Sequence, residues 1–309
     1  MSAKHILVTG IPRCGSTFTG KIMSLSSQLS YIQEPFNPNY GLVGADKHFP
    51  SIDANNPDDK YADLLNDLFS FSAKYKKNYS NDNMFKKMVK FIIGPRAQVN
   101  YRIAKLFRGD NVRLLIKDPD AALLSEQMYL EHDCNALILI RHPGAVYASF
   151  SRLGGTLDIS DFIQKNFFDI HQMPDHAELL KKVDKSPAEQ IGLLWVYIYE
   201  ILNAYFKKHS DWLMVLHEDI SINPIPSFKK IFDWADIEFT DRIKRKITTL
   251  TNANNPVMAR QNKMHDLSRN SASLADYWKK TVSDKDISML KEITEQTVSL
   301  FYDTASWKK

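Results

Sequence analysis

The stretch VTGIPRCGST, from Val8 to Thr17, follows a short apolar run and contains two glycines, Gly10 and Gly15. A β-strand that ends in a glycine turn and continues as a helix directs backbone N–H groups at an anion. The ATP-binding version of this loop carries a Lys directly after its second Gly. Here Ser16 holds that position, and Arg13 is the nearest cation. The stretch therefore predicts a phosphate-binding loop that is not built for a Mg²⁺-bound triphosphate, with an ordinary strand–helix turn as the alternative.

Further apolar runs alternate with helical patterns along the chain. With the strand that enters the loop, they are His5–Gly10, Leu29–Glu34, Val112–Lys117, Ala136–Arg141 and Asp211–Glu218. Short apolar runs between helices are typical of parallel strands buried on both faces. We expect an α/β fold, a three-layer α/β/α domain with a central parallel sheet and a P-loop. Ligands bind outside the carboxyl ends of such strands, where the sequence places the Gly10 loop, Glu34, Lys117-Asp118 and Arg141.

The composition is that of an ordinary globular protein. The 309 residues are 44% hydrophobic and 25% charged, and the formal net charge of +4 is too small to indicate a nucleic-acid partner. No apolar run approaches the roughly 20 residues of a membrane span; the longest, Ile191–Leu202, contains Glu200 and predicts a buried helix. Two cysteines form neither a disulfide framework nor a metal motif. We therefore expect a cytoplasmic protein without a metal.

A second candidate element is LILIRHPGAVYASFSRL, in which a buried strand ends at Arg141. Pro143 suits the first position of a helix, and Ser149 lies eight residues after Arg141. That spacing allows a guanidinium and a hydroxyl to meet one phosphate. Taken alone, the element is as well explained by a capped strand and a neutral helix position.

Together the two elements resemble the sulfotransferases that use 3′-phosphoadenosine-5′-phosphosulfate (PAPS). The family's loop, P-[KR]-x-G-[ST]-[ST], is matched by Pro12-Arg13-Cys14-Gly15-Ser16-Thr17, and its R-x-P-x(5)-S element by Arg141, Pro143 and Ser149. The resemblance implies that the loop holds the 5′-phosphosulfate. It also implies that Arg141 and Ser149 hold the 3′-phosphate.

The resemblance continues downstream and spans Lys4 to about Lys280. Trp212–Phe239 is similar to the family's Y-E-D element, with His217 where the family has Tyr. SRNSASLADYWKK is similar to the basic loop that closes over the nucleotide, which implies a role for Arg269. Phe18 could face the purine, although a core role is an equal alternative.

The resemblance also indicates where the catalytic groups lie. Cytosolic members use a His two residues after a Lys, but Pro119 occupies that position after Lys117. Glu34 resembles the strand-end Glu proposed as base in carbohydrate and bacterial members, and Asp118 is its rival. Arg13 would stabilise the leaving phosphate and Lys117 the sulfuryl oxygens. We prefer Glu34 over Asp118, because an Asp before Pro often only initiates a turn.

The resemblance implies one sulfotransferase-like domain over residues 1–309. Two stretches interrupt the strand–helix alternation, and we interpret residues 51–110 and 154–190 as helical insertions that cover the active site. From Lys74 to Arg108 the chain has ten Lys and Arg against one acid, Asp82. An anionic acceptor or a solvated helix face explains these charges equally well. A carboxylate base favours a sugar or another aliphatic alcohol over a phenol as the small-molecule or glycan acceptor.

Two other functions remain open at this point. A P-loop kinase or nucleotide triphosphatase would use ATP and Mg²⁺, but the loop lacks the Lys that such enzymes need. A catalytically silent nucleotide-binding protein would keep Arg141 and Ser149 without needing a base. The oligomeric state is not readable from the sequence.

Overall fold

The structure is a computed structural model that describes residues 4–52, 59–77, 96–108, 112–152, 186–257 and 267–308. The chain divides into two compact units. Unit 1 comprises Met1–Thr9 and Ser27–Leu137, and unit 2 comprises Gly10–Ser26 and Ile138–Lys309. The boundary falls directly before Gly10, so the predicted phosphate loop belongs to unit 2.

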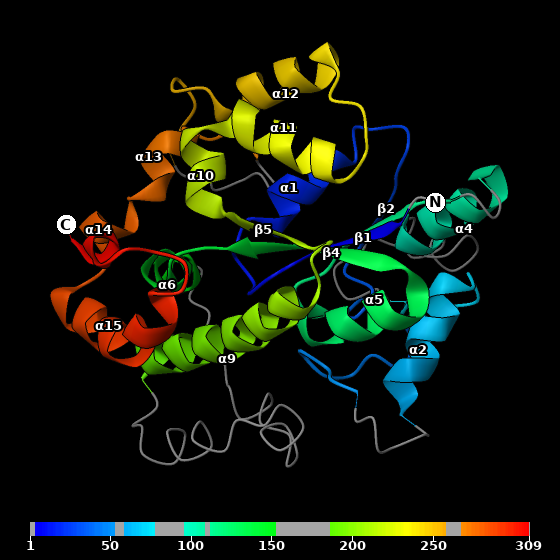
Figure 1. The fold of residues 1–309 in the computed structure, drawn as a ribbon, viewed down its shortest axis with the longest axis horizontal. Coiled ribbons are helices and arrows are strands. Elements are labelled where there is room, and N and C mark those ends of the chain that lie inside the picture. The colour runs from blue at the N-terminus through cyan, green and yellow to red at the C-terminus, as the bar shows by residue number, and fades with distance from the viewer. Residues whose placement is uncertain are drawn as a thin grey trace, which may run out of the picture. The chain divides into compact units, whose positions relative to one another are not determined.

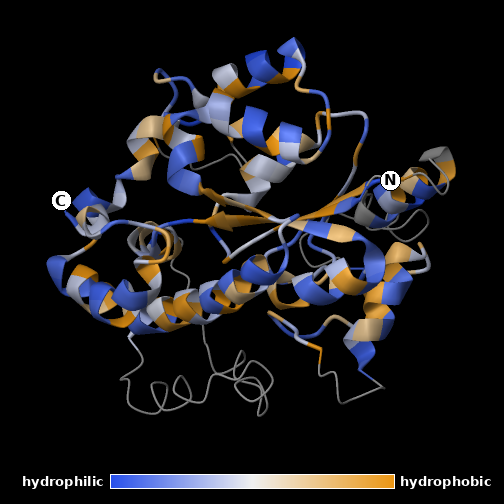
Figure 2. Cartoon of the chain, viewed as in Figure 1, coloured by the Kyte–Doolittle hydropathy of each residue, from blue (hydrophilic) through white to orange (hydrophobic). Residues whose placement is uncertain are grey.

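The described strands form one five-stranded sheet in the order β2-β3-β1-β4-β5. Their bounds are β1 His5–Thr9, β2 Ser30–Gln33, β3 Leu114–Lys117, β4 Cys134–Ile140 and β5 Leu213–Leu216. Strand β3 pairs in parallel with both β1 and β2. Every predicted strand is present within a few residues, and the predicted α/β fold with a central parallel sheet is confirmed. The strands appear as the most continuously apolar elements in Figure 2, as expected for strands covered on both faces.

Unit 1 surrounds β1, β2 and β3 with short helices. These are α2 Lys60–Phe69, α4 Arg96–Arg108, the 3₁₀ turn Ala122–Leu124 and α5 Ser125–His132. Its core combines strand residues with side chains from the helices, among them Leu65 of α2, Tyr101 of α4 and Leu114 of β3. The Tyr101 hydroxyl donates to the carbonyl of Leu68, 2.6 Å away, which ties α4 to the end of α2.

Unit 2 contains most of the helices (Figure 1). They are α1 Ser16–Met23, α6 Pro143–Ser151, α9 Pro187–Lys208, α10 His217–Ile222, α11 Pro224–Trp234, α12 Asp241–Thr251, α13 Ser271–Ala275, α14 Trp278–Thr281 and α15 Asp284–Val298, followed by the 3₁₀ turn Thr304–Trp307. Helix α9 begins with a capping box between Ser186 and Glu189. Its run Ile191–Leu202 is buried, as the sequence predicts, and α9 packs along α6 and α15.

The two predicted insertions are described unequally. Helices α2 and α4 lie within the first, residues 51–110, whereas most of the second, 154–190, lies outside the described residues. Their role as a cover for the active site stays a prediction. The described helices include none with both the length and the apolar character needed to cross a membrane.

Candidate active site

The phosphate loop is built on backbone conformations that favour glycine. Gly10 has φ 138° and Gly15 has φ 98°, both in the region that L side chains rarely adopt. A Cβ atom on Gly10 would lie 2.3 Å from the carbonyl oxygen of Leu139. Arg13 also has a positive φ, 75°, which is a strained conformation for a side chain of its size. The loop leads into α1 at Ser16, and no side chain caps that helix end, so its N–H groups suit an anion.

The ring of His217 covers the second glycine of the loop. A Cβ atom on Gly15 would lie 2.5 Å from Cδ2 of His217, so the imidazole requires a glycine there. The other side of the ring is held by Ser221, whose Oγ lies 3.3 Å from Nδ1. Burial and the nearby guanidinium of Arg141 lower the pKa of His217 well below its usual value, so the ring is neutral at pH 7. His217 therefore packs against the loop as a neutral, orienting group.

Arg141 is joined to the loop by direct hydrogen bonds. Its Nη1 donates to the carbonyl of Arg13 at 2.9 Å, and Nε of Arg13 donates to Oγ of Ser149 at 3.0 Å. Pro143 begins α6 at its first position, as predicted, and the helix carries Ser149 toward Arg13. The Nε–H of Arg141 is buried and has no hydrogen-bond partner among the described residues. An unpaired buried donor is uncommon in folded proteins, which fits a ligand contact at Arg141.

These residues line one cavity of about 330 Å³ in unit 2. Its lining consists of Arg13, Arg141, Ala145, Ala148, Ser149, Arg152, Arg269, Leu274, Tyr277, Trp278 and Thr281. Four guanidinium groups thus face a space whose described lining contains no carboxylate. Burial lowers the pKa of Arg13, and the neighbouring Arg152 and Arg269 lower it further. A cluster of like charges of this density favours an anionic ligand.

The remaining predicted loop residues have different surroundings. Cys14 and Ser16 are buried, and Thr17 is partly exposed. The ring of Phe18 packs edge-on against the fully buried Phe228, with the centroids 5.6 Å apart, which is a core contact. Cys14 lies beneath the loop, where a Cβ on Gly10 would meet its sulfur at 3.1 Å, so it is not placed as an exposed nucleophile.

In unit 1, the predicted base and the predicted lysine form an ion pair. Nζ of Lys117 bonds Oε1 of Glu34, and the backbone N–H of Glu34 donates to the carbonyl of Lys117 at 2.7 Å. The side chain of Lys117 is 3% exposed and that of Glu34 is 13% exposed. Glu34 has φ 47°, a left-handed conformation that is costly for a residue with a side chain. Strain at the end of β2 directs Glu34 toward β3.

Asp118, by contrast, forms hydrogen bonds with the backbone through both of its carboxylate oxygens. Its Oδ2 accepts from the N–H of Phe36 at 2.7 Å and its Oδ1 from the N–H of Asp120 at 2.9 Å. Burial raises the pKa of Asp118 well above its usual value, and the charges of Asp120 and Glu34 raise it further. With 0% exposure and both oxygens in use, Asp118 has the environment of a structural carboxylate.

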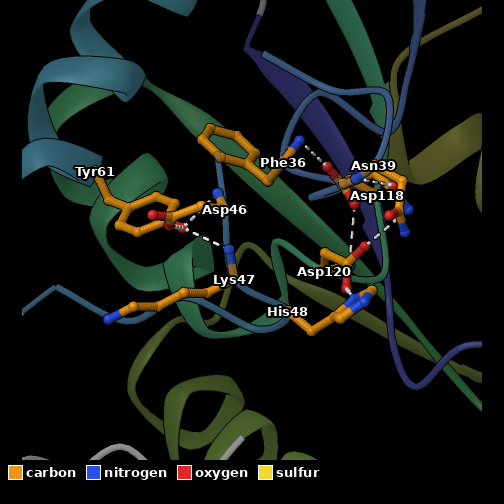
Figure 3. A network of polar contacts seen from close by, with 9 residues as sticks. Phe36, Asn39, Asp46, Lys47, His48, Tyr61, Asp118 and Asp120 are labelled. Atoms are coloured by element: carbon orange, nitrogen blue, oxygen red, sulfur yellow. Dashed lines mark hydrogen bonds and ion pairs between the residues drawn. The ribbon is translucent and has the colours of Figure 1, made fainter. Parts of the chain in front are cut away.

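Figure 3 shows that this network continues through a second acid, Asp120, which was not among the residues predicted from the sequence. Asp120 Oδ1 lies 2.8 Å from Nδ1 of His48, and its Oδ2 accepts from Nδ2 of Asn37 at 3.2 Å. The network ties the turn after β3 to the chain that follows Glu34. Sequence reasoning also missed Arg152, although it lies one helical turn after Ser149 and therefore shares its face of α6.

The family model for the sulfotransferase domain matches residues 3–302. The chain belongs to the sulfotransferase family. No curated protein sequence matches it significantly.

The chain is similar to solved structures of sulfotransferases, and the first of these shares its fold. The sulfotransferase domain from the curacin biosynthetic pathway is 14% identical, with 96% of this chain and 98% of that chain covered and a TM-score of 0.51. Mouse sulfotransferase SULT7A1 complexed with PAP is 12% identical, with 98% and 90% covered and a TM-score of 0.48. STF1 from Mycobacterium tuberculosis H37Rv is 14% identical, with 97% and 77% covered and a TM-score of 0.46.

Family membership makes the protein a sulfotransferase enzyme and decides for sulfuryl transfer over the kinase alternative. Within the described ranges, no three His, Cys, Asp or Glu side chains are grouped in a way that could hold a metal ion.

Proposed function

We propose that this sulfotransferase transfers a sulfuryl group from PAPS to the hydroxyl of a sugar or another aliphatic alcohol, with Glu34 as the base. The observation that carries the donor assignment is the cavity around Arg141. Its described lining has four arginines and no acid, and Arg141 presents a buried N–H without a partner. Those features fit a terminal phosphate ester beside the loop, which is what a 3′-phosphate supplies.

Two elements supply the nucleotide-binding residues in this proposal: the loop that leads into α1, and the segment from Arg141 to Ser149. The open N–H groups at the start of α1 and the loop backbone suit the 5′-phosphate. Arg141 and Ser149 suit the 3′-phosphate, because a guanidinium and a hydroxyl can bind one phosphate from two sides. Arg152 and Arg269 add charge at the same cavity. When bound, PAPS supplies the sulfuryl group and a nucleotide phosphate as the leaving group.

Arg13 has a separate role at the leaving group. Its Nε is bonded to Ser149, which fixes the guanidinium plane within the loop while its other N–H donors remain for phosphate oxygens. A cation held in this way stabilises negative charge that develops on the bridging oxygen as the S–O bond breaks. The strained backbone of Arg13 keeps the side chain on this part of the loop.

Glu34 and Lys117 act as a pair in proton transfer. The Lys117 ammonium lies against the Glu34 carboxylate and holds it at the ends of β2 and β3. When Glu34 accepts the acceptor's hydroxyl proton, the ion pair weakens and Lys117 becomes available to the sulfuryl oxygens. This proposal is supported by the register of the sheet, because Lys117 pairs with Gln33, the residue directly before Glu34. Asp118 is a poorer base, since both its oxygens already accept backbone hydrogen bonds.

The acceptor class follows from the base. An aliphatic hydroxyl is a weak acid and needs a base close to it at neutral pH, whereas a phenol ionises far more readily. A strand-end carboxylate paired with a lysine suits the first kind of acceptor.

Calorimetry with 3′-phosphoadenosine-5′-phosphate (PAP), ADP and ATP–Mg²⁺ tests the donor assignment. Mass spectrometry of the products formed from PAPS with sugar, lipid-alcohol and phenol acceptors tests the acceptor class. We expect PAP to bind more tightly than ADP, because a charge-assisted hydrogen bond contributes about 1.5–3 kcal/mol. Equal affinity for PAP and ADP would contradict the assignment of Arg141 and Ser149. Sulfation of phenols alone would contradict the acceptor class.

A further inference from the structure

Two aromatic residues that follow α15, Tyr302 and Trp307, pack against His142, the residue directly after Arg141. The ring of Trp307 contacts the ring of His142 edge-on, with the centroids 4.4 Å apart, and the ring of Tyr302 does so at 5.2 Å. The face of His142 stacks on Trp278 at 4.5 Å. Because Trp278 also lines the arginine cavity, the C-terminal residues support one wall of that cavity, both through the imidazole of His142 and through a direct edge contact of Trp307 with Trp278, centroids 5.9 Å apart.

His142 and Tyr302 also occupy both oxygens of a half-buried carboxylate, Glu218. The backbone N–H of His142 donates to Oε1 at 3.0 Å, and the hydroxyl of Tyr302 donates to Oε2 at 2.8 Å. Burial lowers the pKa of Arg141, and the charge of Glu218 opposes that shift. Glu218 thus balances the charge of Arg141, yet among the described residues no hydrogen bond or ion pair joins the two.

We infer that Tyr302 is a positioning residue for nucleotide binding, which holds Glu218 away from Arg141 so that the guanidinium, which lines the cavity, stays available to the 3′-phosphate. This inference rests on the proposed function. A carboxylate beside a buried guanidinium ordinarily forms a direct, often bidentate pair. Here the Tyr302 hydroxyl and the His142 N–H satisfy the carboxylate, and the Nε–H of Arg141 has no partner among the described residues.

Removal of the Tyr302 hydroxyl would leave one oxygen of Glu218 without its hydrogen-bond donor. In Tyr302→Phe, such an unsatisfied carboxylate oxygen is costly. Glu218 accepts at 3.0 Å from the backbone N–H of His142, the residue directly after Arg141, so we expect the released carboxylate oxygen to turn to the Arg141 guanidinium. The 3′-phosphate must then compete with Glu218 for the same guanidinium, whereas a ligand without a 3′-phosphate loses nothing.

The test compares the affinities of Tyr302→Phe and the wild-type protein for PAP and for ADP, measured by calorimetry. We expect PAP to bind about tenfold more weakly to the variant, the scale of one hydrogen bond to a charged group, with ADP affinity unchanged. The double variant Tyr302→Phe/Glu218→Gln should regain PAP affinity, because a neutral amide does not compete for the guanidinium. Tyr205→Phe is the matched control, since Tyr205 packs on Trp212 and does not line the cavity.

The outcomes separate the inference from the proposed function. An equal loss for PAP and ADP would show that Tyr302 only stabilises the fold, and unchanged PAP affinity would show that it does not act on Arg141; either result overturns the inference. Failure of Glu218→Gln to restore PAP affinity would also overturn it. A wild-type protein that binds ADP as tightly as PAP would instead overturn the 3′-phosphate assignment on which the inference rests.

Discussion

The polar groups of unit 1 and those of unit 2 are organised in opposite ways. In unit 1 the acids are satisfied by the chain itself: Glu34 pairs with Lys117, Asp118 binds two backbone N–H groups, and Asp120 binds His48 and Asn37. In unit 2 the arginine cavity has no acid in its described lining and leaves a buried N–H of Arg141 without a partner. A network whose hydrogen bonds and ion pairs are all made within the chain holds its groups in place without a ligand. A cavity lined by several cations, with no acid in its described lining, attracts an anionic ligand. Unit 1 is therefore suited to orient a base, and unit 2 to bind the nucleotide.

The largest effect expected from this contrast is on turnover in Glu34→Gln. The amide oxygen can still accept from Lys117, so the buried ammonium keeps a partner and the protein should fold and bind PAP normally. Turnover should nevertheless fall by about 10²–10⁴, the usual contribution of a general base. Steady-state rates with one aliphatic acceptor measure the change.

Asp118→Asn is the control for that prediction. Its amide N–H₂ must face a backbone N–H, so it should lower the free energy of unfolding by about 1–3 kcal/mol, and it should cost less turnover per folded molecule. Normal turnover in Glu34→Gln with lost turnover in folded Asp118→Asn would transfer the role of base to Asp118.

The next effect concerns the loop arginine. Arg13→Ala should lower turnover by about 10²–10³, the scale of losing one donor that stabilises developing negative charge. PAP affinity should fall only modestly, because the loop backbone and the start of α1 remain. Arg13→Lys should retain part of the rate, since it keeps the charge and loses the planar fork. Single-turnover kinetics together with calorimetry separate the two effects, and near-normal turnover in Arg13→Ala would remove the cation from the reaction centre.

Arg141→Ala should affect binding more than chemistry. Loss of a charge-assisted contact of about 1.5–3 kcal/mol should weaken PAP affinity roughly 10- to 150-fold and abolish the preference for PAP over ADP. ADP affinity should change little, which distinguishes a lost 3′-phosphate contact from general damage to the cavity. A retained preference for PAP would place the 3′-phosphate elsewhere.

The smallest effect is expected at the edge of the arginine cavity. Arg152 is exposed, so solvent and salt screen its charge. Arg152→Gln should weaken PAP binding only a few-fold, and the difference should shrink as the salt concentration rises. Lys280→Gln, an exposed charge outside the lining, serves as the control in the same titration. An effect of Arg152→Gln as large as that of Arg141→Ala would contradict the distinction between buried and exposed arginines.

Much of the fold and part of the site were accessible from the sequence, for identifiable reasons. Continuous apolar runs such as Ala136–Arg141 mark buried parallel strands, and the glycines of the loop mark backbone that few residues adopt. Pro143 and Ser149 follow Arg141 on a regular helix, so their spacing alone predicts their placement. Asp120 and Tyr302 could not be selected, because their partners, His48 and Glu218, lie 72 and 84 residues away along the chain.

By itself, the sequence determined the strand–loop–helix at Gly10, the helix at Pro143 and the strand-end groups Glu34, Lys117 and Arg141, because each depends on local backbone preference or on short-range spacing. Only the tertiary structure decided how those groups are paired. It joined Glu34 to Lys117, gave both oxygens of Asp118 to backbone N–H groups, set His217 on Gly15 and gathered Arg152 and Arg269 around Arg141. The physical reason is that ion pairs and hydrogen bonds act over a few ångströms in space, and separation along the chain carries no information about those distances.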